Sequence, residues 1–406
     1  MPDGLSGIRV LEHSVGVAAP DVGVMMGSLG AEVIKIEDPA GGDIFRGAMK
    51  LGGLIPVEGP GGRSLYFEAL NCNKKSVAID LKKQKGKEIL HQLVGVSDVY
   101  LTNYRVGAVH RLGLDYETLR QYNPRLIYCE LTGYGSNGPD RDLPAYDQAA
   151  QARSGIMMVE KSPGDLPYSP PGIADLSNTL SAFAGIALAL FMRERFGIGQ
   201  KVESSLLGTM TQLLKQQLIV SLLAGQEWKP FDRRKAGNPL QNMYQAGDGK
   251  WLFTAMGFTA DRYWPAFCRA LGLGHLEKDP RYMDLSHREE HREELIRLFD
   301  QAFAKYPREY WLKAFREADL IAAPINTVAE MVRDPQVLEN GYLEEFDHPV
   351  LGKVQVASTP FKLSEAPARM RSPAPELGQH TEEVLIDLCH YTWDDITRLK
   401  DEGVIL

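Results

Sequence analysis

The sequence predicts an α/β protein built around a parallel sheet. Between residues 7 and 195, short apolar runs alternate with helix-like stretches. This alternation is typical of parallel strands joined by crossover helices. The predicted strands are residues 8–11, 32–36, 76–79, 98–101 and 126–131, and the predicted helices between them are residues 21–29, 84–94 and 116–121.

The rest of the chain predicts further helices and a smaller domain. A helical pair, residues 180–195 and 204–224, is joined by a glycine-containing turn. A strand at 251–254 and a charged helix at 288–303 with apolar residues at helical spacing follow, then a final helix at 381–388. The 406 residues suffice for two or three domains. We divide them into a large domain (1–200), a helical linker (201–229), a small α+β domain (230–325) and a C-terminal return (326–406).

Composition restricts the class of function. The formal charge of −8 argues against a general nucleic-acid-binding surface. The N-terminus lacks the features of a signal peptide, and the longest apolar run, residues 180–191, is about half the length that spans a bilayer. The four cysteines have no spacing typical of zinc or redox sites. We therefore expect a cytoplasmic protein that binds neither nucleic acid nor membrane.

Several common catalytic motifs are absent. No G-x-G-x-x-G follows the first predicted strand, and G-x-x-x-x-G-K-[ST], H-E-x-x-H and G-x-S-x-G do not occur. His287 and His291 are four residues apart, but they lie in a run of arginine and glutamate that is typical of a solvated helix face. We expect no metal site, and neither a dehydrogenase nor a phosphoryl-transfer enzyme.

One carboxylate lies where a proline-containing loop leads into an apolar helix. Asp175 belongs to the segment PGIADLSN at residues 171–178. As a helix cap it would accept backbone N–H groups of the first turn, which requires no function. As a nucleophile it would use the same N–H groups and the positive helix end to stay ionised in a poorly hydrated site. The residue alone leaves both interpretations open.

A series of short segments, taken in order, resembles one family. These are LGAEVIKIE (29–37), LNCNKKS (70–76), NYRVG (103–107), RLGLDY (111–116), TGYGSNGP (132–139), AYD (145–147), GIAD (172–175) and AAPINT (322–327). Each is weak alone, but their joint order is similar to that of the class III coenzyme A-transferases of the carnitine and bile-acid-inducible type. The resemblance covers nearly the whole chain.

The resemblance implies an architecture and a set of partners. It implies a Rossmann-like large domain built from both chain ends, a smaller inserted α+β domain, and two chains threaded as interlocked rings in a homodimer. It also implies acyl-CoA and carboxylic acid substrates, with no cofactor beyond the coenzyme A moiety of the substrate.

The resemblance also assigns a chemistry to Asp175. Its carboxylate would attack the thioester of an acyl-CoA donor, forming a mixed anhydride and releasing CoA thiolate. The thiolate would then attack the aspartyl carbonyl to leave a CoA thioester on Asp175, and an acceptor acid would take the CoA through a second anhydride. Backbone N–H groups near Asp175 or in glycine-bearing loops would stabilise the oxyanions.

The family contacts the nucleotide part of CoA with residues that match two segments of this chain. An arginine grips phosphate through paired N–H groups, whereas a lysine acts as a point charge. A tyrosine in the same loop either stacks on adenine or packs in the core. Ordinary surface cations would give the same pattern. The predicted CoA contacts are Lys74, Lys75, Asn103, Tyr104, Arg105 and Arg111.

Val17, Ala18 and Tyr146 are predicted to line the acyl pocket. The α-methylacyl-CoA racemase branch of the fold has a histidine where this chain has Tyr146, and a tyrosine has too high an ordinary pKa to share that acid–base work easily. This favours transfer over a racemase, and the full set of family motifs with an intact Asp175 argues against the other alternative, a non-catalytic CoA-binding protein. The formyl-CoA:oxalate branch has a glutamine in place of Val17, so we expect a larger, less polar acid than oxalate.

Overall fold

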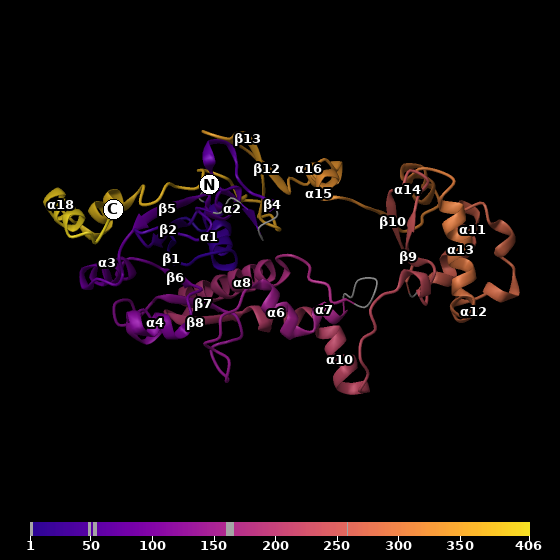
Figure 1. Cartoon of the computed structure of the whole chain (residues 1–406), viewed down its shortest axis with the longest axis horizontal. Helices are drawn as coiled ribbons and strands as arrows, with labels where there is room; N and C mark the ends of the chain where they lie inside the picture. Colours follow the sequence, from indigo (N-terminus) through magenta and orange to yellow (C-terminus); the bar gives the residue numbers. More distant parts are fainter. Residues whose placement is uncertain (1–2, 48–49, 52–54, 160–165, 258) are drawn as a thin grey trace. The chain divides into compact units, whose positions relative to one another are not determined.

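The computed structural model describes residues 3–47, 50–51, 55–159, 166–257 and 259–406 (Figure 1). The chain divides into two compact units. The large unit comprises Met1–Trp228 and Asn340–Leu406, and the small unit comprises Lys229–Glu339. Among the described residues, the large unit holds a six-stranded sheet and the small unit a three-stranded one.

The sheet of the large unit is parallel throughout, which confirms the prediction. Its spatial order is β5-β2-β1-β6-β7-β8. Counted along the chain, this is the 3-2-1-4-5-6 order of doubly wound, Rossmann-like sheets. The strands are β1 (Arg9–His13), β2 (Glu32–Glu37), β5 (Lys74–Ala78), β6 (Val99–Thr102), β7 (Ile127–Thr132) and β8 (Gln200–Ser205).

Strand β8 was not predicted from the sequence, and the helix expected at 204–224 was partly wrong. β8 lies at the edge of the sheet and carries the polar sequence QKVESS, so it lacks the apolar run that marks a buried strand. The expected helix is two helices, α9 (Leu206–Leu213) and α10 (Lys215–Ala224), separated at Leu214.

Helices cover both faces of this sheet. Side chains alternate along a strand, so Val10 faces one helical layer and Leu11 the other. The first layer contains α1 (Ala18–Ser28), α6 (Asp147–Ser154), α8 (Ile173–Phe196) and α9. The second contains α3 (Gln84–Gly95), α4 (Val106–Leu112), α5 (Tyr116–Leu119), α17 (Thr381–Cys389) and α18 (Trp393–Asp401).

Helix α8 is longer than predicted. It begins at Ile173 rather than at residue 180, so Asp175 lies inside its first turn. Of the described helices, α8 alone is long and apolar enough to span a bilayer. Core helices of globular proteins meet the same criterion, and α8 buries Ala174, Ala182 and Ile186 in the core of the large unit.

The C-terminal segment packs on the large unit. His348, on strand β12, lies 3.1 Å from Glu68 on helix α2, and Ile405 forms an antiparallel bridge with Ile79. The predicted final helix is followed by one more, α18, whose Thr392 and Asp395 form a capping box. The other elements of this unit are β3 (Lys50–Leu51), β4 (Ile55–Pro56), a 3-10 helix (Pro60–Gly62), α2 (Leu65–Asn71), α7 (Ile156–Val159), β12 (Leu343–His348) and β13 (Gly352–Ala357).

The small unit has its own core. Aromatic side chains such as Phe267, Phe299 and Trp311 are buried between its helices and an antiparallel sheet ordered β11-β10-β9. Its strands are β9 (Gln241–Gln245), β10 (Trp251–Ala255) and β11 (Ala322–Ile325). Its α-helices are α11 (Ala260–Ala270), α12 (Leu285–Glu290), α13 (Arg292–Phe303), α14 (Arg308–Glu317), α15 (Val328–Met331) and α16 (Pro335–Glu339). Three 3-10 helices are Arg233–Lys235, Gly274–Leu276 and Pro280–Tyr282.

Candidate functional site

The topology of the large sheet indicates where a ligand binds. In doubly wound sheets, ligands occupy the crevice outside the carboxyl ends of the strands, where the strand order reverses. Here the order reverses between β1 and β6. Residues 14–17, called loop 14–17 below, follow β1, and residues 103–105 follow β6. Two predicted site segments, separated by more than 80 positions in the chain, therefore meet at one edge of the sheet.

Loop 14–17 is held by side chains from outside the loop. The Lys35 ammonium donates to the carbonyl of Ser14 at 3.0 Å. The Asn103 amide makes two hydrogen bonds to Val15, accepting from its N–H at 3.0 Å and donating to its carbonyl at 2.6 Å. Asp43 accepts from the N–H of Gly16 at 3.4 Å. Gly16 has a φ of +83°, a conformation that favours glycine, so the turn of the loop depends on this residue.

Beneath this loop lies a buried network of paired charges. Lys35 contacts Glu12 at 2.9 Å and Asp43 at 3.0 Å, and Lys74 contacts Glu12 at 2.8 Å. All four side chains are fully buried. Burial opposes the charge on Lys35, but the nearby carboxylates outweigh it and raise its pKa. Helix α1 covers the network closely, since a Cβ on Gly23 would collide with the Glu12 carboxylate.

This network changes the assignment of Lys74. Its ammonium has no exposed surface, and besides Glu12 it donates to the carbonyls of Pro20 and Leu70, each at 2.8 Å. A cation whose donors are all taken cannot reach a CoA phosphate without breaking the core. We therefore remove Lys74 from the predicted phosphate contacts and assign it a structural role.

The other predicted CoA contacts divide into two groups. Arg105 and Arg111 are exposed, and the half-exposed Lys75 pairs with Glu32 at 3.0 Å and Glu383 at 2.8 Å. Tyr104 is half-buried and stacks on His13, with ring centroids 4.3 Å apart. Burial, with Lys35 nearby, lowers the pKa of His13 to about 3, so this ring is neutral. One face of the Tyr104 ring is therefore occupied, and Asn103 is engaged with Val15.

The start of helix α8 is capped by a residue from another helix. Asp147, in the first turn of α6, accepts from the N–H groups of Ala174 at 2.8 Å and Asp175 at 3.2 Å through one carboxylate oxygen. Its second oxygen accepts from the N–H of Gly172 at 2.9 Å. Asp147 thus makes the contacts that a cap makes, and the interpretation of Asp175 as the cap of its own helix is wrong.

Gln151 fixes this arrangement from one turn further along α6. Its amide donates to Asp147 at 2.6 Å and to the carbonyl of Pro170 at 2.7 Å, and it accepts from the Ser169 hydroxyl at 3.1 Å. Gln151 is fully buried. One side chain therefore ties the cap of α8 to the segment that leads into α8.

The carboxyl group of Asp175 lies in an unfavourable environment for charge. Burial, and then the neighbouring Asp147 carboxylate, raise its pKa to about 7. Within the described residues, neither carboxylate forms an ion pair. The expectation that the helix end keeps Asp175 ionised therefore has to be corrected, because Asp147 already accepts from the N–H groups of that end. The N–H groups of Ala174 and Asp175 are likewise engaged, which leaves the glycine-bearing loops as candidates for oxyanion stabilisation.

Thr179 links Asp175 to the predicted acyl-pocket residues. Its hydroxyl lies 3.0 Å from the carbonyl of Ala18 and 3.2 Å from the carbonyl of Asp175. Val17 directly precedes α1. Helices α1 and α8 are in contact, and the bond from Thr179 to Ala18 joins α8 to the first residue of α1. Tyr146 directly precedes Asp147, and its side chain is 74% exposed. Helix α1, which Val17 precedes and Ala18 begins, thus packs on α8, and Tyr146 is next in sequence to the residue that caps α8.

Comparison with known proteins identifies the family. The sequence matches the model of CoA-transferase family III over residues 5–381. The chain belongs to CoA-transferase family III.

Similar proteins cover nearly the whole of this CoA-transferase. A succinate–glutarate CoA-transferase from Agrobacterium fabrum is 34% identical over 95% of this chain and 95% of its own length. A cinnamoyl-CoA:phenyllactate CoA-transferase from Clostridium sporogenes is 32% identical over 99% of this chain and 97% of its own. The crystal structure of a CAIB/BAIF family protein from Brucella suis has a TM-score of 0.83 and 30% identity, and the match covers 96% of this chain and 100% of that one.

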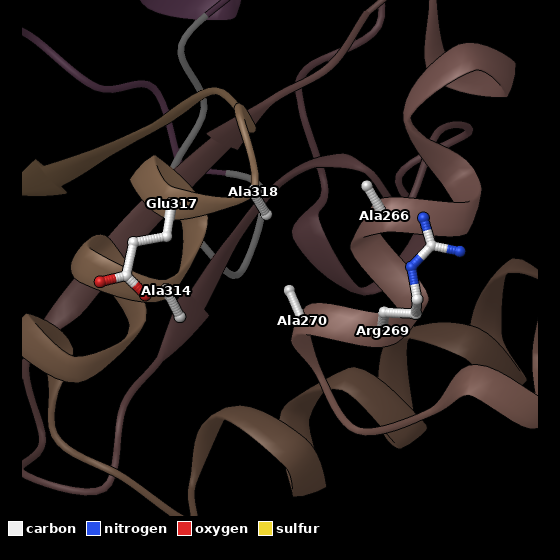
Figure 2. A pocket seen from close by; sticks show the side chains of 6 residues that line it. All are labelled: Ala266, Arg269, Ala270, Ala314, Glu317 and Ala318. Atoms are coloured by element: carbon white, nitrogen blue, oxygen red, sulfur yellow. The ribbon is translucent and has the colours of Figure 1, made fainter.

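A hollow of 370 Å³ in the small unit of this CoA-transferase contains none of the predicted site residues. Figure 2 shows four alanine methyl groups between α11 and α14, with Arg269 and Glu317 beside them. Arg269 pairs with Glu277 at 2.8 Å. The described residues contain no cluster of histidine, cysteine and acidic side chains that could hold a metal ion. The large unit therefore carries the candidate site.

Sequence reasoning missed the residues that support this site. Asp147 was noticed only as part of the AYD motif, and Gln151, Lys35 and Asp43 were not singled out. A signal for Gln151 exists, because it follows Asp147 by four positions and so shares its helix face. A signal for Lys35 also exists, because it interrupts the apolar strand sequence EVIKIE.

Proposed function

We propose that this CoA-transferase moves coenzyme A from an acyl-CoA donor to a carboxylic acid acceptor through covalent intermediates on Asp175. The observation that carries the proposal is the position of Asp175. It lies in the first turn of α8, which Asp147 caps, and the Thr179 hydroxyl lies within hydrogen-bond distance of its carbonyl and of the carbonyl of Ala18. A carboxylate that is not needed as a cap, in a poorly hydrated environment, is suited to covalent chemistry.

The steps balance without a further reactant. The Asp175 carboxylate attacks the donor thioester carbonyl, the C–S bond breaks, and CoA leaves as thiolate. The thiolate attacks the aspartyl carbonyl of the anhydride, which releases the donor acid as carboxylate and leaves aspartyl-CoA thioester. The acceptor carboxylate attacks the carbonyl of the aspartyl-CoA thioester, the C–S bond breaks, and CoA thiolate leaves as a second anhydride forms. The thiolate finally attacks the acceptor carbonyl of this anhydride to give the new acyl-CoA and the free Asp175 carboxylate. The scheme requires no metal and no organic cofactor beyond CoA.

Three exposed or half-exposed cations are proposed to contact the CoA phosphates. Arg105 follows β6 at the switch point and precedes α4, and Arg111 lies in the last turn of that helix. Lys75 lies in β5 at 33% side-chain exposure. Arginine suits a diphosphate and lysine acts as a point charge on a monophosphate; Arg105 lies at the carboxyl edge of the sheet, whereas Lys75 lies near the amino end of β5 and pairs with Glu32 and Glu383.

A substrate acid larger and less polar than oxalate is proposed, because Val17, which directly precedes helix α1 beside α8, is apolar. The names of the relatives include both a dicarboxylate and an aryl acid as substrates. These two relatives are 34% and 32% identical to this chain, so sequence identity does not favour dicarboxylates over aryl acids as substrates. A preference of the wild-type enzyme for oxalate in a panel of acceptor acids would contradict this part of the proposal.

A homodimer is proposed from the apolar surface of two helices. Leu180, Leu188 and Phe191 of α8 are 47%, 61% and 55% exposed, and Leu222 and Leu223 of α10 are 76% and 80% exposed. Monomeric proteins rarely expose such apolar faces to water, so a second copy of the chain is proposed to cover them. Sedimentation at micromolar concentration should give a dimer, and a stable monomer would contradict the proposal.

The first experiment traps the intermediate. The enzyme is incubated with acetyl-, succinyl-, isovaleryl- and cinnamoyl-CoA, quenched with hydroxylamine, and digested for peptide mass spectrometry. We expect a hydroxamate at Asp175 with at least one donor, and none in Asp175→Asn, whose turnover should fall by about 10³-fold or more. An unmodified Asp175 with every donor would contradict covalent transfer. Exchange of the donor α-proton for deuterium in that case would indicate a racemase instead.

A further inference from the structure

The amide of Asn103 is committed to the backbone of loop 14–17. Both of its polar atoms bond to Val15, one to the N–H and one to the carbonyl, as a neighbouring strand would. A side-chain amide has two donor hydrogens and two acceptor lone pairs, so Asn103 keeps only one of each for another partner. Direct binding of CoA would have to share or break these bonds.

Asn103 does not act alone on the loop. Three consecutive residues are held: Ser14 by Lys35, Val15 by Asn103 and Gly16 by Asp43. These anchors come from three different places in the sequence, and Lys35 and Asp43 are fixed by the buried charge network. The two peptide units between Ser14 and Gly16 are anchored, and a loop fixed in this way loses little conformational entropy when a ligand binds.

The anchored loop ends at the residues beside Asp175. Val17 follows Gly16 directly, and the carbonyl of Ala18 lies 3.0 Å from the Thr179 hydroxyl, which also lies 3.2 Å from the carbonyl of Asp175. A displacement of Val15 is therefore transmitted along two residues to the wall of the proposed acyl pocket.

We propose that Asn103 is a positioning residue that, with Lys35 and Asp43, fixes loop 14–17 and thereby determines which acyl groups fit beside Asp175. This inference rests on the proposed function and adds the origin of its substrate selectivity. A pocket wall discriminates between acyl groups only if it cannot move to accommodate them. One methylene in a fixed apolar pocket changes the preference by about 10- to 200-fold, and a movable wall loses part of this.

The test is a comparison of binding with and without an acyl group. The affinities for free CoA, acetyl-CoA, isovaleryl-CoA and cinnamoyl-CoA are measured by titration calorimetry in Asp175→Asn with and without Asn103→Ala, because these variants cannot form the covalent intermediates. We expect the affinity for free CoA to stay within about twofold, because free CoA has no acyl group to contact loop 14–17. We expect the ratios among the three acyl-CoA species to change by about fivefold or more. In turnover assays, the ratios of kcat/KM among the same three acyl-CoA donors should also differ between wild type and Asn103→Ala.

Asn123 offers a matched control. Its amide likewise bridges backbone groups, donating to the carbonyls of Val94 and Ser97 at 3.3 and 2.7 Å and accepting from Arg125, but at the amino-terminal edge of the sheet. Asn123→Ala should lose comparable stability and keep all affinity ratios. Asn103→Asp serves as a second variant, because it retains the acceptor for the Val15 N–H and loses the donor to the Val15 carbonyl.

Two results would overturn the inference. If affinity for free CoA falls as much as that for every acyl-CoA, Asn103 binds CoA directly. If neither Asn103 variant alters any ratio, the loop does not depend on Asn103. Failure of the proposed function looks different, because it gives no trapped Asp175 in the wild type while these binding ratios can still be measured.

Discussion

Two stretches of backbone form the candidate site, and both are held by buried polar side chains. Loop 14–17 is anchored by Lys35, Asn103 and Asp43. The first turn of α8 is anchored by Asp147, which Gln151 fixes in turn. The two sets of anchoring side chains differ in whether their carboxylates are paired with cations. Lys35 and Lys74 balance Glu12 and Asp43, whereas no cation among the described residues pairs with Asp147 or Asp175.

This difference separates a structural role from a functional one. In a buried network of paired charges each ion has a counter-ion, and removing one member leaves an unpaired charge. Two neighbouring carboxylates without a cation cost stability, and they shift the pKa of Asp175 into the range where a reaction can use it. Buried carboxylates are therefore paired with cations beneath loop 14–17, whereas at the start of α8 a neighbouring carboxylate adds to the effect of burial and raises the pKa of Asp175.

The largest effect is expected from breaking the balanced network. Lys35→Met leaves Glu12 and Asp43 buried with one cation fewer and frees the Ser14 carbonyl. We expect a loss of about 3–5 kcal/mol in the free energy of unfolding, measured with denaturant. Lys82→Met is the control, because Lys82 pairs with Asp38 at 76% side-chain exposure and should have no measurable effect. Equal losses in the two variants would contradict the role given to the network.

A smaller effect of opposite sign is expected from neutralising Asp175. Its folded pKa of about 7 lies above the ordinary value, so stability is fully present below the ordinary pKa and is lost as pH rises through 7. Asparagine resembles the protonated carboxyl at every pH. Asp175→Asn should therefore be more stable than wild type, with a gain about 1–2 kcal/mol larger at pH 8 than at pH 5. Unfolding at both pH values tests this, and a gain independent of pH would show that Asp175 is ionised throughout.

The smallest effect concerns the charge of Asp147. Asp147→Asn keeps an oxygen that can accept from the first turn of α8 but removes the negative charge beside Asp175. Because burial is the larger cause of the raised pKa, we expect only a partial fall, by about one unit. The acidic limb of kcat/KM, which reports the free enzyme, should move to lower pH by this amount.

The control for this experiment is Asp394→Asn. Asp394 is also an acidic residue in the first turn of a helix, but it is exposed on α18. Its replacement should leave the pH profile unchanged. An unshifted limb in Asp147→Asn would mean that burial alone sets the pKa of Asp175.

Sequence reasoning predicted the central strands because their apolar runs are long enough to be buried on both faces. It missed β8, which is polar and lies at the edge of the sheet. It placed Asp175, Val17, Ala18 and Tyr146 in the site through family resemblance; the structure packs α1 on α8 and links Ala18 to Asp175 through Thr179, while the roles of the four residues stay predictions.

The anchoring residues could not be predicted in the same way. The cap of α8 comes from Asp147, 28 positions before Asp175, whereas sequence rules for caps use neighbours within one turn. Lys74 has the sequence context of a phosphate contact, and only the fold reveals that Glu12 and two backbone carbonyls surround it. Charged residues inside apolar strands, such as Glu12 and Lys35, are the usable signal, because buried charges must be paired.

The position of Asp147 has a consequence for the catalytic cycle. Under the proposed scheme, each covalent intermediate converts the Asp175 carboxylate into an uncharged acyl derivative. The negative charge next to Asp147 then disappears, and it returns when the thiolate attacks the acceptor carbonyl and frees Asp175. The repulsion between the two carboxylates is therefore relieved for as long as Asp175 carries a substrate group.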